Sequence, residues 1–401
     1  MAIHMHAPDN CEQITINQPR RPAATIHVWV PDFAGATGGI QTFSRFLVHG
    51  LKDGFPEAEV TVFAKNDSSA PPIDEIRFAS FRATGTWTLA QRTLAFSARL
   101  LIDTIRRRPD LIVVTHINFA PVAYWLHKLL GVRYLVVAHG VEIWKRPDQQ
   151  VRTALRNASS LVAVSNYTRD RMSEVLNVSV DEIGLLPNTF DPDNFEPGPK
   201  PRFLLKRYGL SEEQPVILTI ARLASAERYK GYDQLLQALV DIRKRFPNVC
   251  YLLGGRGPDR PRIERMVSQL GIKKNVVLAG YIPDEELNAH YNLCDVFAMP
   301  SKGEGFGIVF LEALACGKPV IAGNKDGSVD ALLNGKLGVL VDPDNIAEIV
   351  TGISTILSER SEVRNQKSAE LRRAVIEAYG YPRFVERLAG LVGPLIRDQS
   401  R

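Results

Sequence analysis

Cysteine is scarce in this sequence of 401 residues, which contains only four cysteines (Cys11, Cys250, Cys294 and Cys316). None belongs to a Cys-x-x-Cys pair, so we expect neither a disulfide framework nor a zinc site, and a reducing cytoplasm is the simplest setting. Asp191-Pro-Asp193 and Asp342-Pro-Asp344 resemble metal-binding Asp-x-Asp motifs. Each stands where a linker or a helix begins, however, and an aspartate there is an ordinary cap. We therefore expect no metal and no other cofactor.

Long apolar runs are missing as well. The most apolar region, 111–138, is interrupted by polar and charged residues (His116, Asn118, His127, Lys128 and Arg133), so we expect no membrane-spanning helix. Residues 1–21 are polar and lack the apolar core of a signal peptide, and we expect them to form a flexible tail.

The chain also lacks an excess of one charge. Its net charge is +5, with acidic and basic residues mixed along the sequence. A nucleic-acid binder needs a concentrated basic face, so we expect no nucleic-acid partner. One basic stretch, from Arg92 to Arg108, places arginines among apolar residues at near-helical spacing. We interpret it as a surface helix with a solvated basic end, and docking on an anionic membrane is the alternative.

Strand and helix patterns alternate along the chain, and its 45% hydrophobic content is enough for two α/β domains with large cores. In the first half, strands are expected at 25–30, 60–64, 76–81, 111–115, 134–138, 161–164 and 183–186, and helices at 88–106 and 151–157. In the second half, strands are expected at 216–220, 249–253, 276–278, 296–299, 319–321 and 339–341, and helices at 232–245, 261–270 and 284–293.

A proline-rich segment, 191–201, separates these halves and is expected to be a linker. We therefore predict an α/β protein with two Rossmann-like, doubly wound domains, residues 22–190 and 202–378, that face each other across a cleft. The last stretch, from 346 to 397, reads as long and helical.

The most informative stretch, 295–323, predicts a strand, a loop with three glycines between 302 and 307, a short helix and a second strand. A helix N terminus exposes unpaired N–H groups, so it binds phosphate readily, and Gly305 and Gly307 carry no Cβ that would keep a ligand away. Glu304 and Glu312 are suited to accept hydrogen bonds from neighbouring sugar hydroxyls. The stretch therefore favours a ligand with an anion and a polyol.

Glu304 and Glu312 form a Glu-x7-Glu pair within Glu-Gly-Phe-Gly-Ile-Val-Phe-Leu-Glu-Ala-Leu-Ala-Cys-Gly-Lys-Pro-Val-Ile. This sequence resembles the signature of the retaining glycosyltransferases of family GT4, which have the two-domain GT-B fold. The resemblance implies that Glu312 holds the ribose hydroxyls of a nucleotide sugar and that Glu304 holds those of the transferred sugar. It also implies that the C-terminal helix, 379–401, packs back on the first domain. The diphosphate would lie on the backbone of Gly305, Phe306, Gly307 and Ile308.

The first domain supplies three further candidates. Gly38-Gly39 follows the first strand, although such pairs are common in turns. His139 follows the strand at 134–138 and therefore faces the cleft, although a lone histidine is more often structural. By resemblance, the Gly38-Gly39 loop binds the donor and His139 touches the donor sugar. His116, which follows the preceding strand, is a weaker candidate for the acceptor site.

Two cations follow the first strand of the second domain. Arg222 and Lys230 suit a pyrophosphate and would stabilise the leaving nucleoside diphosphate. They resemble the family's Gly-Arg-Leu…Lys-Gly motif, with Ala221 in place of the glycine. The loop that contains Arg256 and the segment that contains Ile282 are expected to border the nucleobase.

We therefore predict a retaining, metal-independent glycosyltransferase that moves a hexose from GDP-mannose or a UDP-hexose to a glycan or lipid-linked saccharide in bacterial polysaccharide synthesis. Its expected catalytic residues are His139, Arg222, Lys230 and Glu304. A nucleotide-sugar epimerase of the same fold, a phosphorylase and a non-catalytic sugar-nucleotide-binding subunit are the alternatives. We expect a cytoplasmic protein, located at the inner face of the membrane if the basic stretch docks there.

Overall fold

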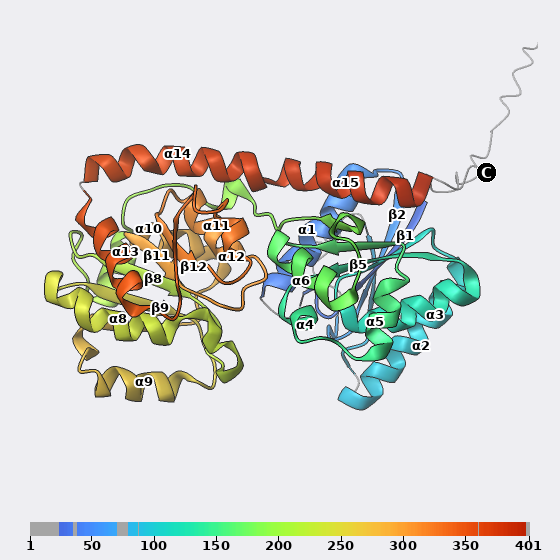
Figure 1. Ribbon diagram of the computed structural model, residues 1–401, viewed down its shortest axis with the longest axis horizontal. Helices are drawn as coiled ribbons and strands as arrows, with labels where there is room; N and C mark the ends of the chain where they lie inside the picture. Colours follow the sequence, from blue (N-terminus) through green and yellow to red (C-terminus); the bar gives the residue numbers. More distant parts are fainter. Residues whose placement is uncertain (1–23, 35–37, 70–78, 87, 360, 398–401) are drawn as a thin grey trace, which may run out of the picture.

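The computed structural model describes residues 24–34, 38–69, 79–86, 88–359 and 361–397. Its strands form two parallel sheets, with the orders β3-β2-β1-β4-β5-β6-β7 and β10-β9-β8-β11-β12-β13 (Figure 1). The first sheet contains β1 (Ala24–Val30), β2 (Ala58–Ala64), β3 (Ala79–Ala83), β4 (Leu111–Val114), β5 (Arg133–Ala138), β6 (Ser160–Ala163) and β7 (Ile183–Leu185). The second contains β8 (Val216–Ile220), β9 (Cys250–Gly254), β10 (Val276–Gly280), β11 (Val296–Met299), β12 (Val320–Gly323) and β13 (Val339–Val341).

The predicted α/β fold with two parallel sheets is confirmed, and every expected strand overlaps an observed one. The strand expected at 76–81 begins outside the described residues, as do the expected tail (1–21) and Cys11. The short apolar runs were informative because parallel strands are buried on both faces. In β8, for example, Val216 and Leu218 enter one core while Ile217 enters another.

Helices cover both faces of each sheet. In the first domain they are α1 (Gly39–Gly54), α2 (Leu89–Arg107), α3 (Ala120–Leu130), α4 (Val141–Trp144), α5 (Gln149–Arg156) and α6 (Asn166–Leu176). The second domain has α7 (Arg202–Tyr208), α8 (Tyr232–Arg245), α9 (Arg260–Gln269), α10 (Leu287–Leu293), α11 (Ile308–Ala315), α12 (Ser328–Ala331) and α13 (Ile346–Ser358). Two last helices, α14 (Ser361–Tyr379) and α15 (Tyr381–Arg397), complete the chain.

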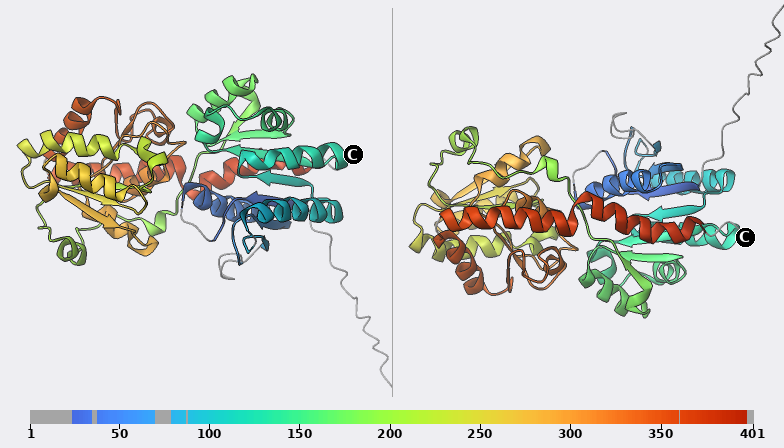
Figure 2. Two further views of the ribbon diagram at one scale, coloured as in Figure 1. Left: turned by 90° about the horizontal axis from the view of Figure 1, so that it is seen from below. Right: turned by 90° about the horizontal axis from the view of Figure 1, so that it is seen from above.

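The long helical stretch expected at 346–397 consists of three helices, α13, α14 and α15. Helix α14 packs against the second domain and α15 against the first, and the two run end to end across both (Figures 1 and 2). Gly50 on α1 makes this contact close, since a Cβ there would lie 3.0 Å from Leu388 Cδ2. Phe384 meets Phe43 edge to face at 5.9 Å. The C-terminal segment thus joins both domains independently of the linker.

Two other expectations can be compared with the structure. Asp191 caps a short 3-10 helix by accepting from Asp193 N at 3.1 Å, as expected for a cap. Asp342 likewise accepts from Asp344 N at 2.9 Å and also pairs with Lys325, whereas α13 itself is capped by Asn345. No helix among the described residues is long and apolar enough to cross a membrane.

A buried histidine makes the first domain sensitive to acid. The His27 ring on β1 is fully buried at 4.8 Å from the Phe63 ring, and neither ring nitrogen has a hydrogen-bond partner among the described residues. Burial, with a smaller contribution from Arg107, lowers the pKa of His27 from 6.5 to about 4. Between these two values the unfolded chain binds a proton that the folded chain does not, so stability falls as the pH falls.

The free energy of unfolding of the wild type falls between pH 7 and pH 4. We predict that this fall is smaller by about 3 kcal/mol in His27→Leu. Urea unfolding at a series of pH values measures this difference. The wild type, measured in parallel, is the reference. An unchanged slope in His27→Leu would contradict the assignment.

Candidate active site

The glycine-rich loop of the second domain, residues 302–307 (here the glycine loop), touches the first domain directly. A Cβ on Gly305 would lie 1.5 Å from the carbonyl oxygen of His139, and one on Gly140 would lie 2.9 Å from Gly305 Cα. Real Cβ atoms do not approach other atoms so closely, so both glycines are required for this contact. Gly307, with φ +95°, then begins α11 in a conformation that favours glycine. The Phe306 side chain turns away and packs against the Tyr379 ring at 5.2 Å, which leaves its backbone for a ligand.

Glu304 and Lys230 form an ion pair within the second domain. Both side chains are largely buried, with 14% and 17% of their surface exposed. Burial disfavours the charged amine, but the Glu304 carboxylate outweighs it, so the pKa of Lys230 is raised. Lys230 ends a 3-10 helix, Ser225–Lys230, whose Tyr229 carbonyl accepts from Lys302 N at 2.9 Å. The glycine loop and the lysine are thereby held together.

Asp326, which the sequence reasoning did not identify, orders the glycine loop. Its fully buried carboxylate accepts from Ser301 Oγ at 2.6 Å, Glu304 N at 2.7 Å and Ser328 N at 2.9 Å. Gly327 N donates in turn to the Glu304 carbonyl at 2.8 Å. Burial raises the pKa of Asp326, and these hydrogen bonds oppose the shift. Its position just after β12 was a weak signal, because aspartates are common in turns.

Glu312 lies on α11 and accepts from the Tyr291 hydroxyl at 2.6 Å. Burial raises the pKa of Glu312 to about 7, although the Tyr291 hydrogen bond lowers it. The pKa of the Glu312 carboxyl group therefore lies near neutral pH. A ligand that donates hydrogen bonds, such as a pair of vicinal hydroxyls, would favour its ionised form.

Arg222 follows β8 and faces the other domain. It contacts Glu227 at 3.2 Å, and 60% of its side-chain surface is exposed. A Cβ placed on Gly38 would lie 3.4 Å from Arg222 Nη2, so this guanidinium reaches the N terminus of α1. At Gly39, the first residue of α1, a Cβ would meet no atom of the described residues within 4 Å. Arg222 and the Gly38-Gly39 loop, which were both predicted to bind the donor, therefore border the same space between the domains.

Arg256 and Ile282 follow β9 and β10. The Arg256 guanidinium stacks over the Tyr281 ring, 4.7 Å from its centroid. Ile282 is buried because its side chain packs under Gly254, where a Cβ would lie 2.4 Å from Ile282 Cδ1. Tyr281 is 45% exposed. The stacked Arg256–Tyr281 pair, rather than the Ile282 side chain, is therefore what this segment presents to a planar ligand.

His139 is held tightly at the end of β5. The ring Nε2 of His139 lies 3.0 Å from the Thr115 carbonyl oxygen, and the Phe43 ring meets the imidazole edge to face at 4.8 Å. The backbone N–H of His139 donates to the Glu142 carboxylate at 2.5 Å. Burial lowers the pKa of His139 to about 4, so the ring is neutral at pH 7. His116 accepts from Asn118 N at 3.3 Å, and burial lowers its pKa as well. Glu142, not identified from the sequence, thus positions His139 through its backbone.

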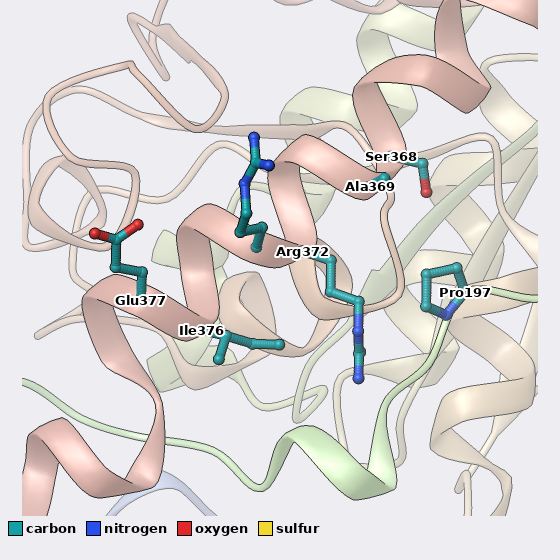
Figure 3. A pocket seen from close by; sticks show the side chains of 7 residues that line it. Pro197, Ser368, Ala369, Arg372, Ile376 and Glu377 are labelled. Carbon is teal, nitrogen blue, oxygen red and sulfur yellow. The ribbon is translucent and has the colours of Figure 1, made fainter.

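Other features lie outside this site. Among the described residues, no group of three histidine, cysteine, aspartate or glutamate side chains could hold a metal ion. A surface groove of about 670 Å³ lies between the linker residue Pro197 and α14, with Arg372 and Ile376 on its wall (Figure 3). None of its lining residues belongs to the glycine loop, and the groove lies where α14 packs beside the linker.

Comparisons with known proteins first define the class. The fold superimposes on sucrose-phosphate synthase from Thermosynechococcus elongatus with a TM-score of 0.79 and 21% identity, over 93% of this chain and 99% of that one. A glycosyltransferase from Rickettsia africae gives a TM-score of 0.79 and 19% identity, over 94% and 99%. The fold is that of the two-domain GT-B glycosyltransferases, as expected.

Sequence relatives then define the family. Residues 202–377 match the family Glycosyl transferases group 1, and residues 37–194 match Glycosyltransferase Family 4. A GDP-mannose-dependent alpha-(1-6)-phosphatidylinositol monomannoside mannosyltransferase from Mycolicibacterium smegmatis is 35% identical, over 82% of this chain and 88% of that protein. A 2-deoxystreptamine glucosyltransferase from Streptomyces kanamyceticus is 28% identical, over 73% and 78%. The chain belongs to the group 1 (GT4-type) glycosyltransferases, and the predicted family is confirmed.

The contact between Gly305 and His139 gives a test of the site. We predict that Gly305→Ala lowers glycosyl transfer about 100-fold or more, because the added methyl group separates the two halves of the site. Gly390→Ala is the control, since a Cβ at that position on α15 meets no atom within 4 Å. Transfer rates and melting temperatures of both variants should be measured. Full activity in folded Gly305→Ala would contradict the arrangement.

Proposed function

We propose that the protein transfers mannose from GDP-mannose to a lipid-linked or glycan saccharide in bacterial envelope synthesis, with retention of the anomeric configuration and without a metal. The observation that carries the donor proposal is the relative named as GDP-mannose-dependent, which is 35% identical over 82% of this chain. The sequence had left GDP-mannose and UDP-hexoses open. The 2-deoxystreptamine glucosyltransferase relative, at 28% identity over 73% of this chain, supports transfer of glucose less strongly.

In the proposed complex, the two cations bind the diphosphate. Arg222 offers an exposed guanidinium, and Lys230 exchanges Glu304 for a phosphate oxygen. The freed Glu304 carboxylate then accepts from hydroxyls of the mannose, and Glu312 accepts from those of the ribose. The guanine base stacks beside the Arg256–Tyr281 pair. Because two fixed cations already oppose the diphosphate charge, the proposal needs no divalent ion.

We propose retention without a covalent intermediate, because the groups beside the sugar offer no free nucleophile. Glu304, once released by Lys230, is engaged by the mannose hydroxyls, and the His139 ring is neutral and directed at the Thr115 carbonyl. We propose a same-face displacement, in which the bond from the mannose C1 to the phosphate oxygen breaks and the acceptor oxygen bonds to C1. The acceptor proton passes to the departing phosphate oxygen. Arg222 and Lys230 stabilise the GDP that leaves.

We predict that GDP raises the melting temperature more than UDP or ADP and that the shift survives EDTA. At about 100 times its dissociation constant, a ligand adds about 2.7 kcal/mol to the stability. Arg222→Ala and Lys230→Ala should lose most of this shift, whereas Arg260→Ala on α9, a surface arginine that pairs with Glu264, should keep it.

Transfer assays with GDP-mannose and UDP-glucose, with NMR of the product anomer, complete the test. An inverted product would refute the same-face displacement. A shift with UDP alone would replace GDP-mannose by a UDP-hexose. The absence of any shift in folded protein would refute the donor site and favour a non-catalytic subunit.

We further propose that α2 and α3 contact a membrane surface. Six of the ten exposed large hydrophobic side chains among the described residues lie on these two neighbouring helices (Leu94, Leu101, Ile102, Ile105, Trp125 and Leu129). On α2 they recur at helical spacing on the face opposite the buried Phe96 and Leu100. An apolar stripe on an otherwise packed helix indicates a partner.

The charges beside this stripe favour anionic lipid. Arg106 and Arg108 end α2 without an ion pair among the described residues, and Lys128 lies on α3. A bilayer accommodates both the apolar side chains and the cations. A lipid acceptor would then meet the enzyme at the surface on which it lies, and the mycobacterial relative is named for such a lipid.

We predict that Leu101→Gln combined with Ile105→Gln abolishes sedimentation with vesicles that contain anionic lipid. Phe203→Gln, which changes an equally exposed aromatic residue on α7 of the second domain, should leave it intact. Binding should weaken at high salt and be much lower with neutral vesicles. Equal vesicle binding by the wild type and the double variant would exclude this surface.

A further inference from the structure

Asp330 joins the two domains at a point that the donor-site proposal does not include. It lies on α12 of the second domain, and its carboxylate reaches the N terminus of α6 in the first domain. Oδ1 accepts from Asn166 Nδ2 at 2.5 Å, and Oδ2 accepts from Tyr167 N at 3.1 Å. A carboxylate at a helix N terminus is favourable because it pairs with unsatisfied N–H groups and with the positive end of the dipole.

Helix α6 does not need this carboxylate for its own cap. Ser165 already caps it, since its Oγ accepts from Thr168 N at 3.0 Å. The second cap, supplied by the other domain, therefore stabilises the relation between the domains more than it stabilises α6. We call the contact of Asp330 with Asn166 and Tyr167 the clasp.

The clasp connects directly to the glycine loop. Asp330 lies four residues after Asp326, which accepts from Glu304 N at 2.7 Å, and Gly327 N donates to the Glu304 carbonyl at 2.8 Å. A Cβ on Gly327 would lie 2.0 Å from the Gly305 carbonyl, so the start of α12 and the loop are in close contact. The position of α6 relative to α12 is thus transmitted to Glu304 through a few rigid contacts.

The surroundings of the clasp allow it to open. A cavity of about 180 Å³ borders it, lined by Asn166, Phe306, Asp330 and Tyr379 among others. A polar contact beside a cavity can separate without tearing an apolar core, because water can satisfy the groups that it exposes. Opening at this point would release α12 and the loop together.

We propose that Asp330 is a positioning residue that favours the closed arrangement of the domains and thereby sets Glu304 for transfer. This inference rests on the proposed function, since it concerns the same donor loop. The clasp forms when α6 and α12 meet, and its loss shifts the protein toward an open form in which Gly305, next to Glu304, no longer touches the His139 carbonyl. Domain closure commonly completes such sites.

We predict that Asp330→Ala lowers kcat about tenfold, Asp330→Asn less, and Asn166→Ala least, because the last variant leaves the Tyr167 N–H contact intact. The double variant Asn166→Ala/Asp330→Ala should have the same kcat as Asp330→Ala, since the Asp330 change already removes the Asn166–Asp330 hydrogen bond. GDP should still raise the melting temperature of each variant. Small-angle X-ray scattering with GDP-mannose should show less compaction in Asp330→Ala than in the wild type.

Asp148→Ala is the matched control. Asp148 is an exposed carboxylate that caps α5 within the first domain by accepting from Val151 N at 2.9 Å. Its loss should reduce stability as much as an ordinary cap does, with kcat and compaction unchanged. Normal compaction or normal kcat in Asp330→Ala would overturn the inference, as would an equal effect of Asp148→Ala. If the wild type compacts with GDP-mannose more than Asp330→Ala does yet transfers no sugar, the proposed function is refuted, while the role of Asp330 in domain closure stands.

Discussion

The close approach of Gly305 to the His139–Gly140 turn is the constraint on which the rest of the site depends. A side chain at Gly305 would overlap the His139 carbonyl, so the distance between the domains at this point is set by two backbones. Side chains that flank this contact, Glu304 on one side and Glu142 on the other, inherit their positions from it. A donor bound here would touch groups from both domains, which separates it from water as the domains close.

The charges of the candidate site suit an anionic ligand. Lys230 is largely buried and remains charged because Glu304 accompanies it. Removing either charge alone would leave the other buried without a partner, which costs more than the pair contributes. A diphosphate can replace Glu304 at the amine without leaving a bare charge, provided that the displaced carboxylate finds hydroxyl donors. A nucleotide sugar carries both groups, whereas a free diphosphate carries only one.

The sequence predicted the sheets well and the site in part, for identifiable reasons. Parallel strands are short apolar runs, and the glycine loop with its Glu-x7-Glu pair is a local pattern. Both features depend on residues that are close in sequence, so the sequence alone predicts them. Asp326 and Asp330 could not be, because their roles depend on Ser301, Glu304 and α6, which are distant in sequence. Ile282 was expected beside the base but is buried under Gly254, since the side on which a strand-end residue emerges depends on the adjacent strand.

The clasp lies close to the place where the chain passes from one domain to the other. The linker and the α14–α15 junction cross side by side, joined by a bridge between Phe190 and Gly380 and by Thr189 Oγ1 donating to the Tyr379 carbonyl at 2.7 Å. The Tyr379 hydroxyl donates to the Asp330 carbonyl, so α12 is anchored at this crossing. Movements near a hinge are small, but a hydrogen bond weakens steeply as its geometry departs from linearity. A small rotation of the domains can therefore break a hydrogen bond beside the hinge, whereas an apolar interface there would keep most of its contacts.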